Sequence, residues 1–183
     1  MHVRSWYKCL ALHVSLYLGA CGGLQLESSP SRSILLSGTW LVDTASSDDV
    51  SSAMRPDGRR GDDWLSTRAE IERIQRGSGL AFVAYDFQVL EARRMTIELA
   101  EDSMGVKHEP GVYRDVSWGE RERGIWEVQA GWEEDVLVVA SRTNGISVVE
   151  RYQLLAPNRL QVTLHIRADG NKRQVQRYFR RQR

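Results

Sequence analysis

The chain has 183 residues and a mass of 20.9 kDa, the size of one domain with a short appendage. Apolar residues make up 42% of it and charged residues 27%, a balance that excludes an intrinsically disordered protein, a protein with many membrane spans and a collagen-like fibre. The 25 basic residues nearly balance the 24 acidic ones, so the net charge of +1 gives no support to nucleic-acid binding.

Residues 1–20 have the features of a bacterial signal peptide. Arg4 and Lys8 supply positive charge ahead of an apolar stretch over 9–18, which is too short to cross a bilayer because a spanning helix needs about 20 residues. A run that resembles the lipobox of bacterial lipoproteins follows, Leu18-Gly19-Ala20-Cys21. In a lipobox the small side chains admit the peptidase and the cysteine thiol accepts a diacylglyceryl group. We therefore predict cleavage after residue 20 and an acylated Cys21.

The residues after Cys21 bear on where the protein is held. Gly22 stands where an aspartate usually retains a lipoprotein in the inner membrane, and 21–36 has the composition of a flexible tether. We expect a protein anchored by its acyl chains in the bacterial cell envelope, at the outer membrane and facing the periplasm. The alternative interpretation is a cytosolic protein with a short buried N-terminal helix, in which Cys21 is an ordinary core cysteine.

The folded part, 37–183, opens with one strand and a helical insertion. Residues 37–43 are β-branched and aromatic and predict a first strand. Apolar residues at helical spacing predict a helix over 62–76 and a second over 80–94, although part of the second segment also alternates as a strand would. A one- or two-helix insertion over 62–94 therefore follows the first strand.

From residue 95 the apolar period changes from helical spacing to two. Hairpin turn sequences such as Asn144-Gly145 and Asp169-Gly170 separate the segments. The predicted strands are 95–100, 104–108, 112–118, 124–132, 136–142, 146–155, 159–167 and 173–181. Such short, regularly spaced strands predict a mainly β protein, an antiparallel meander that removes its edges by closing into a barrel of eight or nine strands.

Alternation also assigns one face of each strand to the barrel interior, because consecutive side chains point to opposite faces of a sheet. Most inward positions are apolar, as in 159–167. In 112–118 the apolar inward residues are Val112, Val116 and Trp118. Four inward positions are polar or charged, namely His108, Arg114, Glu150 and Arg177.

These four residues allow two interpretations. A buried charge is costly unless it is paired, so Glu150 either forms a structural ion pair with an arginine or lies in water at the barrel mouth. Alternatively, arginines bind an anionic group of a ligand between apolar walls. The candidate ligand-binding residues are Arg114, Trp118, Trp126, Glu150, Tyr152 and Arg177.

The first strand carries the run Gly38-Thr39-Trp40-Leu41-Val42-Asp43. With the meander and an arginine-bearing last strand, this run resembles the lipocalin superfamily and, within it, small bacterial lipocalin-like lipoproteins of unassigned function. The resemblance implies a lipocalin-like barrel. It also implies that Gly38 and Trp40 close the barrel floor, with Arg177 or Arg180 packed over the indole.

No catalytic or metal-binding constellation emerges. The mature chain has two histidines, His108 and His165, on opposite faces, so we expect no metal site. The acidic runs Glu133-Glu134-Asp135 and Glu120 with Glu122 fall at predicted turns, where charges are ordinarily solvated. The sequence also lacks nucleophile-elbow and nucleotide-binding motifs. We therefore expect neither enzymatic activity nor a cofactor.

The sequence thus predicts an envelope lipoprotein whose barrel binds a small apolar or amphiphilic ligand, with 62–94 as a lid. The alternative is a filled barrel with no ligand cavity, acting as an interaction or structural lipoprotein. The membrane, reached through the acyl chains, is the expected partner. The basic C-terminal run 172–183 adds an envelope polyanion or a protein as a further partner, and export argues against nucleic acid.

Overall fold

The computed structural model describes residues 24–57 and 64–182. The predicted signal peptide and Cys21 lie outside these described residues. The helices are α1 (Val50–Ala53), α2 (Arg68–Gln75) and α3 (Gly79–Asp86), with 3-10 turns at Trp64–Ser66 and Gln88–Leu90. The strands are β1 (Gly38–Val42), β2 (Arg94–Leu99), β3 (Ser103–Glu109), β4 (Tyr113–Ser117), β5 (Gly119–Arg123), β6 (Trp126–Glu133), β7 (Val136–Thr143), β8 (Ile146–Ala156), β9 (Arg159–Ala168) and β10 (Asn171–Arg181). None of the helices in the described ranges is long and apolar enough to span a bilayer.

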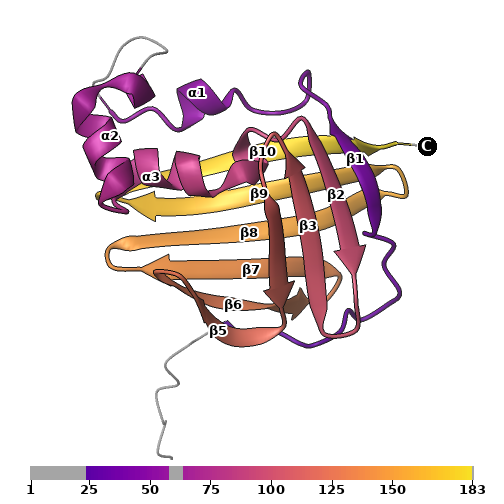
Figure 1. Ribbon diagram of the computed structural model, residues 1–183. Coiled ribbons are helices and arrows are strands. Elements are labelled where there is room, and N and C mark those ends of the chain that lie inside the picture. Colours follow the sequence, from indigo (N-terminus) through magenta and orange to yellow (C-terminus); the bar gives the residue numbers. More distant parts are fainter. Residues whose placement is uncertain (1–23, 58–63, 183) are drawn as a thin grey trace, which may run out of the picture.

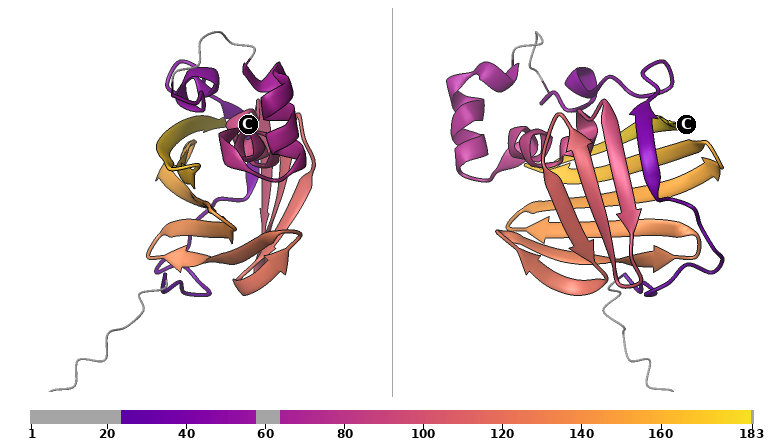
Figure 2. Two further views of the ribbon diagram at one scale, coloured as in Figure 1. Left: turned by 90° about the vertical axis from the view of Figure 1, so that its left-hand side faces the viewer. Right: turned by 45° about the vertical axis from the view of Figure 1, so that its right-hand side comes forward.

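The ten strands form one antiparallel sheet that curls into a nearly closed barrel. Their order is β4-β3-β2-β1-β10-β9-β8-β7-β6-β5, so the first strand pairs with the last. In Figure 1, β1–β4 cross steeply in front of β7–β10, and Figure 2 shows the two layers from the side. The predicted mainly β meander with helices after the first strand is confirmed.

The barrel has one strand more than the eight or nine predicted. The additional strand is β5, whose sequence Gly-Glu-Arg-Glu-Arg has no apolar residue and therefore no alternation to detect. It forms because its backbone pairs with β6, where Glu122 lies opposite Glu127. The prediction that Glu120 and Glu122 fall in a turn was therefore wrong.

The helical insertion is shorter than predicted and has different boundaries. Helix α2 starts at Arg68 rather than 62, and the Thr67 hydroxyl accepts a hydrogen bond of 3.3 Å from the Glu70 backbone N–H. The second segment forms α3 only as far as Asp86, and β2 begins at Arg94. The first six residues of α3 are buried because the helix lies between α2 and the end of the barrel near β9, whereas Tyr85 at its C-terminal end is exposed.

The predicted faces are largely confirmed. On β9 the residues Leu160, Val162, Leu164 and Ile166 are all buried. Val112 is an exception, with 63% of its surface exposed, because it precedes β4 in a turn and lies outside the ladder.

The tether predicted over 21–36 is held against the barrel in its described part, where the Glu27 backbone pairs with Trp132 on the edge of β6.

Trp40 is fully buried at the predicted floor, where its Nε1–H donates to the Leu36 carbonyl at 2.9 Å. The arginine over its ring is Arg181, at 4.2 Å from the centroid, rather than Arg177 or Arg180. The register explains this correction, because Arg181 lies directly opposite Trp40 on β10. Glycine is required at position 38, next to Arg181. The φ of Gly38 is +136°, and a Cβ at this position would lie 2.5 Å from Arg181 Nη1.

Candidate functional site

The barrel interior contains a charged cluster built from three of the predicted residues. Arg114 on β4 donates from Nη1 to Glu150 Oε2 at 2.7 Å, and the Tyr152 hydroxyl donates to Glu150 Oε1 at 3.0 Å. Glu150 and Tyr152 are two residues apart on β8 and therefore share its inward face, both fully buried. We call Arg114, Glu150, Tyr152 and the nearby His108 the inner cluster.

Arg114 has more donors than the ion pair uses. Its side chain is only 10% exposed, and its guanidinium carbon lies 5.8 Å from the centroid of the Phe87 ring. The Nε and Nη2 atoms are buried and have no hydrogen-bond partner among the described residues. Buried donors in proteins are almost always paired, so two unpartnered nitrogens on one guanidinium, with three N–H groups between them, mark a place where a ligand or water is expected.

The surroundings set the charge of each group in the inner cluster. Burial lowers the pKa of Arg114, but the acidic groups around it, Glu150 foremost, together offset this effect, so the pKa is raised overall. Burial, reinforced by the negative charge of Glu150, holds the pKa of Tyr152 well above its usual value. Arg114 is therefore a permanent cation beside a neutral tyrosine.

His108 is the neutral member of the inner cluster. Burial lowers its pKa to about 4, an effect that Glu150 opposes and Arg114 reinforces. Its Nε2 is buried and has no partner among the described residues. The imidazole thus adds a further unpaired polar atom to the interior without adding charge.

Protonation of His108 is expected to make the stability of the fold depend on pH. Because its pKa is about 4 in the fold and about 6.5 when unfolded, its contribution is fully present above pH 6.5 and is lost as pH falls from there toward 4. The loss between pH 7.5 and 4.5 amounts to about 3 kcal/mol. Urea unfolding at both pH values should show a smaller difference for His108→Gln than for the wild type. A His165→Gln variant, altered at an exposed histidine, is the control, and an unchanged difference in His108→Gln would contradict the prediction.

A pocket at the barrel mouth lies next to the inner cluster. It has a volume of about 400 Å³ and is lined by α2, α3 and the β5–β6 hairpin, including Phe82, Asp86, Arg123 and Trp126. Asp86 accepts hydrogen bonds from Trp126 Nε1 at 2.8 Å and from Arg123 Nη2 at 3.3 Å, which ties α3 to the hairpin. We call it the mouth pocket.

Aromatic rings separate the mouth pocket from the inner cluster. The Trp126 ring stacks on Phe82 at 5.6 Å and meets the edge of Phe87 at 5.2 Å. Burial and the Arg114 charge lower the pKa of Arg123. The Phe87 ring contacts both Trp126 and the Arg114 guanidinium, and it therefore joins this aromatic layer to the inner cluster.

Two predicted site residues lie apart from the inner cluster. Trp118 donates from Nε1 to the Glu101 carbonyl at 2.9 Å and packs edge-on against Trp132. Arg177 donates to the carbonyls of Asp48 and Ala92, both at 3.4 Å, and its described contacts do not include Arg114. Burial lowers the pKa of Arg177.

The sequence interpretation did not assign Asp86, Phe87 or Arg123 to the site. Phe87 was detectable, since it lies on the apolar spacing of 80–94. Asp86 and Arg123 carried no detectable signal, because a charged residue beside a turn is ordinarily solvated.

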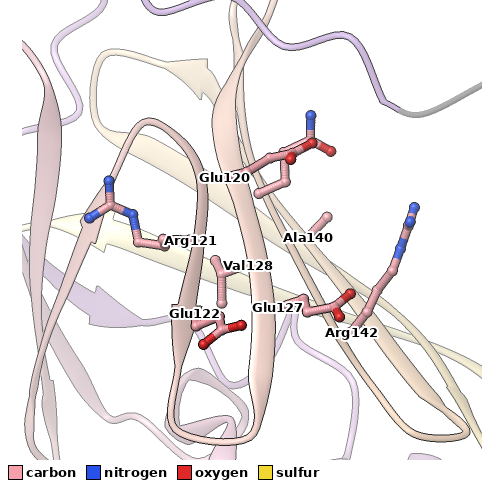
Figure 3. Close-up of a pocket in the computed structure, with 8 residues that line it drawn as sticks. Glu120, Arg121, Glu122, Glu127, Val128, Ala140 and Arg142 are labelled. Carbon is pink, nitrogen blue, oxygen red and sulfur yellow. The ribbon is translucent and has the colours of Figure 1, made fainter.

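A second pocket, of about 370 Å³ and lined by Glu120, Glu122 and Glu127, lies on the outer surface of β5–β7 and outside the barrel (Figure 3).

The architecture has counterparts among solved structures. The chain is similar to the wild-type fluorescent protein UnaG, with a TM-score of 0.50 and 16% identity over 80% of this chain and 97% of UnaG. A single-residue variant of UnaG matches with the same TM-score and identity over 81% of this chain and 96% of the variant. The chain therefore shares the barrel fold of UnaG. No protein-family sequence model matches the chain, and no curated protein sequence matches it. At this identity the likeness shows the fold alone, so the chemistry of this barrel must be argued from its own residues.

Proposed function

We propose that this barrel is an envelope lipoprotein that binds a small amphiphile with an anionic head group. The run ending in Cys21 supports the anchor, and the inner cluster supports the ligand class. The two parts are independent, since a soluble barrel could bind such a ligand and an anchored barrel need not.

The observation that carries the ligand proposal is the pair of unpaired donors on Arg114. Glu150 already neutralises the charge of the guanidinium, and yet Nε and Nη2 remain buried without partners among the described residues. Two oxygens of a carboxylate or sulfonate can each accept one of two parallel N–H groups, one from Nε and one from Nη2. His108 Nε2 is a further unpaired polar atom in the same cluster.

Entry is proposed to occur through the mouth pocket. Helix α3 is tied to the β5–β6 hairpin by the Asp86 contacts and by packing of Phe82 on Trp126, rather than by a strand ladder. Such a contact can open without unfolding the sheet. This arrangement agrees with the sequence-based hypothesis that 62–94 forms a lid.

The second candidate function is that of a filled barrel acting through its outer surface. The observation that favours it is the packing of large buried side chains in the barrel, among them Trp40, Tyr152, Phe87 and Phe179. In this alternative, ordered water pairs the free donors of Arg114 and no organic ligand enters.

Two ligands that differ only in the head group test the proposal. Decanoate and decanol are titrated into the full-length Cys21→Ser chain, with tryptophan fluorescence as the readout because Trp126 lines the mouth pocket. Decanoate is expected to bind at least tenfold more tightly than decanol, since charge-assisted hydrogen bonds contribute about 1.5–3 kcal/mol. The double variant Arg114→Gln/Glu150→Gln, which leaves no unpaired charge, should lose the preference, whereas the exposed Arg121→Gln control should keep it.

Equal binding of decanoate and decanol would contradict the proposed role of Arg114. Native mass spectrometry of the protein extracted gently from its host's membranes distinguishes the remaining possibilities. A mass that matches acylated Cys21 with a dissociable adduct supports both parts of the proposal. An acylated mass without adduct, together with no binding of either probe, would favour the filled barrel. An unprocessed Met1 would refute the anchor.

A further inference from the structure

A row of exposed cations crosses the outer surface of the barrel. The register aligns Arg142 on β7 with Ser147 on β8, Ser147 with Arg167 on β9, and Arg167 with Lys172 on β10. Adjacent strands lie about 4.8 Å apart, so the three cations span a distance on the order of 15 Å. We call Arg142, Arg167 and Lys172 the basic row.

No cation of the basic row forms an ion pair within 4 Å among the described residues, although Glu127 lies opposite Arg142 on the neighbouring strand. All three side chains are exposed. Other arginines on the same strands do form ion pairs, Arg151 with Glu133 and Arg180 with Asp43.

The outward positions of β8–β10 contain no acidic residue. They are Ser147, Val149, Arg151, Gln153, Leu155, Arg159, Gln161, Thr163, His165, Arg167, Lys172, Gln174, Gln176, Tyr178 and Arg180. Acidic side chains begin where the same row continues past β7, since Glu127 on β6 lies opposite Arg142 and Glu122 on β5 lies opposite Glu127. Selective placement of this kind concentrates positive potential on one face of a chain that is nearly neutral overall.

The surface beside the basic row is hollowed. A groove of about 530 Å³ is lined by the three cations together with His165, Gln174 and Val149. An exposed groove with cations spaced along it fits phosphate groups that repeat across a surface better than it fits one small anion.

The start of the described chain lies close to the same face. The Leu24 carbonyl accepts a hydrogen bond of 2.7 Å from Gln129 Nε2 on β6. Gln129 aligns with Ala140, Val149 and His165, and this row is directly adjacent to the basic row. Cys21 precedes Leu24 by only three residues, a chain length of at most about 11 Å. A lipid attached to Cys21 would therefore enter a bilayer near this face.

We propose that the basic row binds the head groups of anionic phospholipids and so orients the barrel on the membrane surface. The setting rests on the proposed envelope localisation, but the electrostatic contact requires neither acylation nor a ligand in the barrel. The acyl chains would supply the attachment, and the basic row would determine which face of the barrel meets the bilayer.

Vesicle binding by the full-length Cys21→Ser chain tests the contact without the acyl anchor. The probes are vesicles of phosphatidylcholine alone and with 30% phosphatidylglycerol (about 0.1 M salt), and the readout is co-sedimentation. Each cation near an anionic surface strengthens binding by roughly fivefold, so Arg142→Gln/Arg167→Gln/Lys172→Gln should lose on the order of 100-fold in affinity for the anionic vesicles. Binding through the apolar N-terminal segment is common to all variants and cancels in the comparison.

A matched variant removes three exposed cations elsewhere, as Arg93→Gln/Lys107→Gln/Arg121→Gln. It should keep most of the preference for anionic vesicles, and salt near 1 M should abolish the preference of the wild type. Equal losses in the two triple variants would overturn the proposal, because net charge rather than the basic row would then explain binding. Tight binding to a soluble anionic glycan without a preference for anionic vesicles would overturn the lipid assignment. Failure of acylation at Cys21 would refute the anchor. It would not change the vesicle binding expected of the basic row.

Discussion

Replacing Arg114 by methionine is expected to destabilise the fold by about 3–5 kcal/mol, because the change leaves the Glu150 carboxylate buried without its counter-charge. Glu150 is fully buried, and its only other described partner is the Tyr152 hydroxyl. One neutral hydrogen bond cannot replace the 2.7 Å ion pair with Arg114. Urea unfolding at pH 7 measures the loss as a lower midpoint with an unchanged slope.

The double variant Arg114→Met/Glu150→Gln separates the cost of an unpaired charge from the contribution of the pair. The glutamine keeps an oxygen that can accept from Tyr152, so most of the lost stability should return. Arg121→Met, altered at an exposed arginine, is the control and should change stability by less than about 0.5 kcal/mol. If the double variant were as unstable as Arg114→Met, an unpaired charge would not be the cause.

Replacing Trp40 by alanine should also cost about 3–5 kcal/mol, since the change removes the largest fully buried side chain among the described residues. The indole joins three parts of the chain. It donates to the Leu36 carbonyl, stands on β1 opposite Met95 of β2, and lies beneath Arg181 of β10. Arg181 donates in turn to the Leu35, Ser37 and Pro157 carbonyls, so the loss of the ring loosens the closure of the barrel.

A Trp40→Phe variant separates the two roles of the indole. The phenyl ring keeps much of the packing but leaves the Leu36 carbonyl without its donor, which costs about 1–3 kcal/mol. Thermal and urea unfolding measure both variants, with Tyr85→Ala on the exposed side of α3 as the control. A loss below about 1 kcal/mol in Trp40→Ala would show that the floor does not hold the barrel closed.

Strand faces and the interior polar residues could be predicted from the sequence alone, because the strand period of two is a local property of the chain. It identified His108, Glu150 and Arg177 as inward, and all three are buried. It also identified Arg114 as inward, and the side chain of this residue is only 10% exposed. The apolar pattern before the lipobox-like run is local too, and the anchor that it predicts at Cys21 lies outside the described residues and stays a prediction.

The tertiary structure decided which inward charges meet. Arg114 and Glu150 are 36 residues apart and come together only because the sheet curls, whereas Arg177 contacts other parts of the chain. Strand β5 shows the same dependence, since a strand of charged residues is specified by its neighbour rather than by its own pattern.

Register accounts for the remaining difference between sequence and structure. Among the arginines of the last strand, only the pairing of β1 with β10 selects Arg181 as the partner of Trp40. The alignment of Arg142, Arg167 and Lys172 also arises from pairing across four strands, in residues that are scattered along the sequence. The sequence by itself determined which side chains face inward, because that depends on adjacent residues. Only the fold determined which side chains become neighbours, because the register between strands depends on barrel closure.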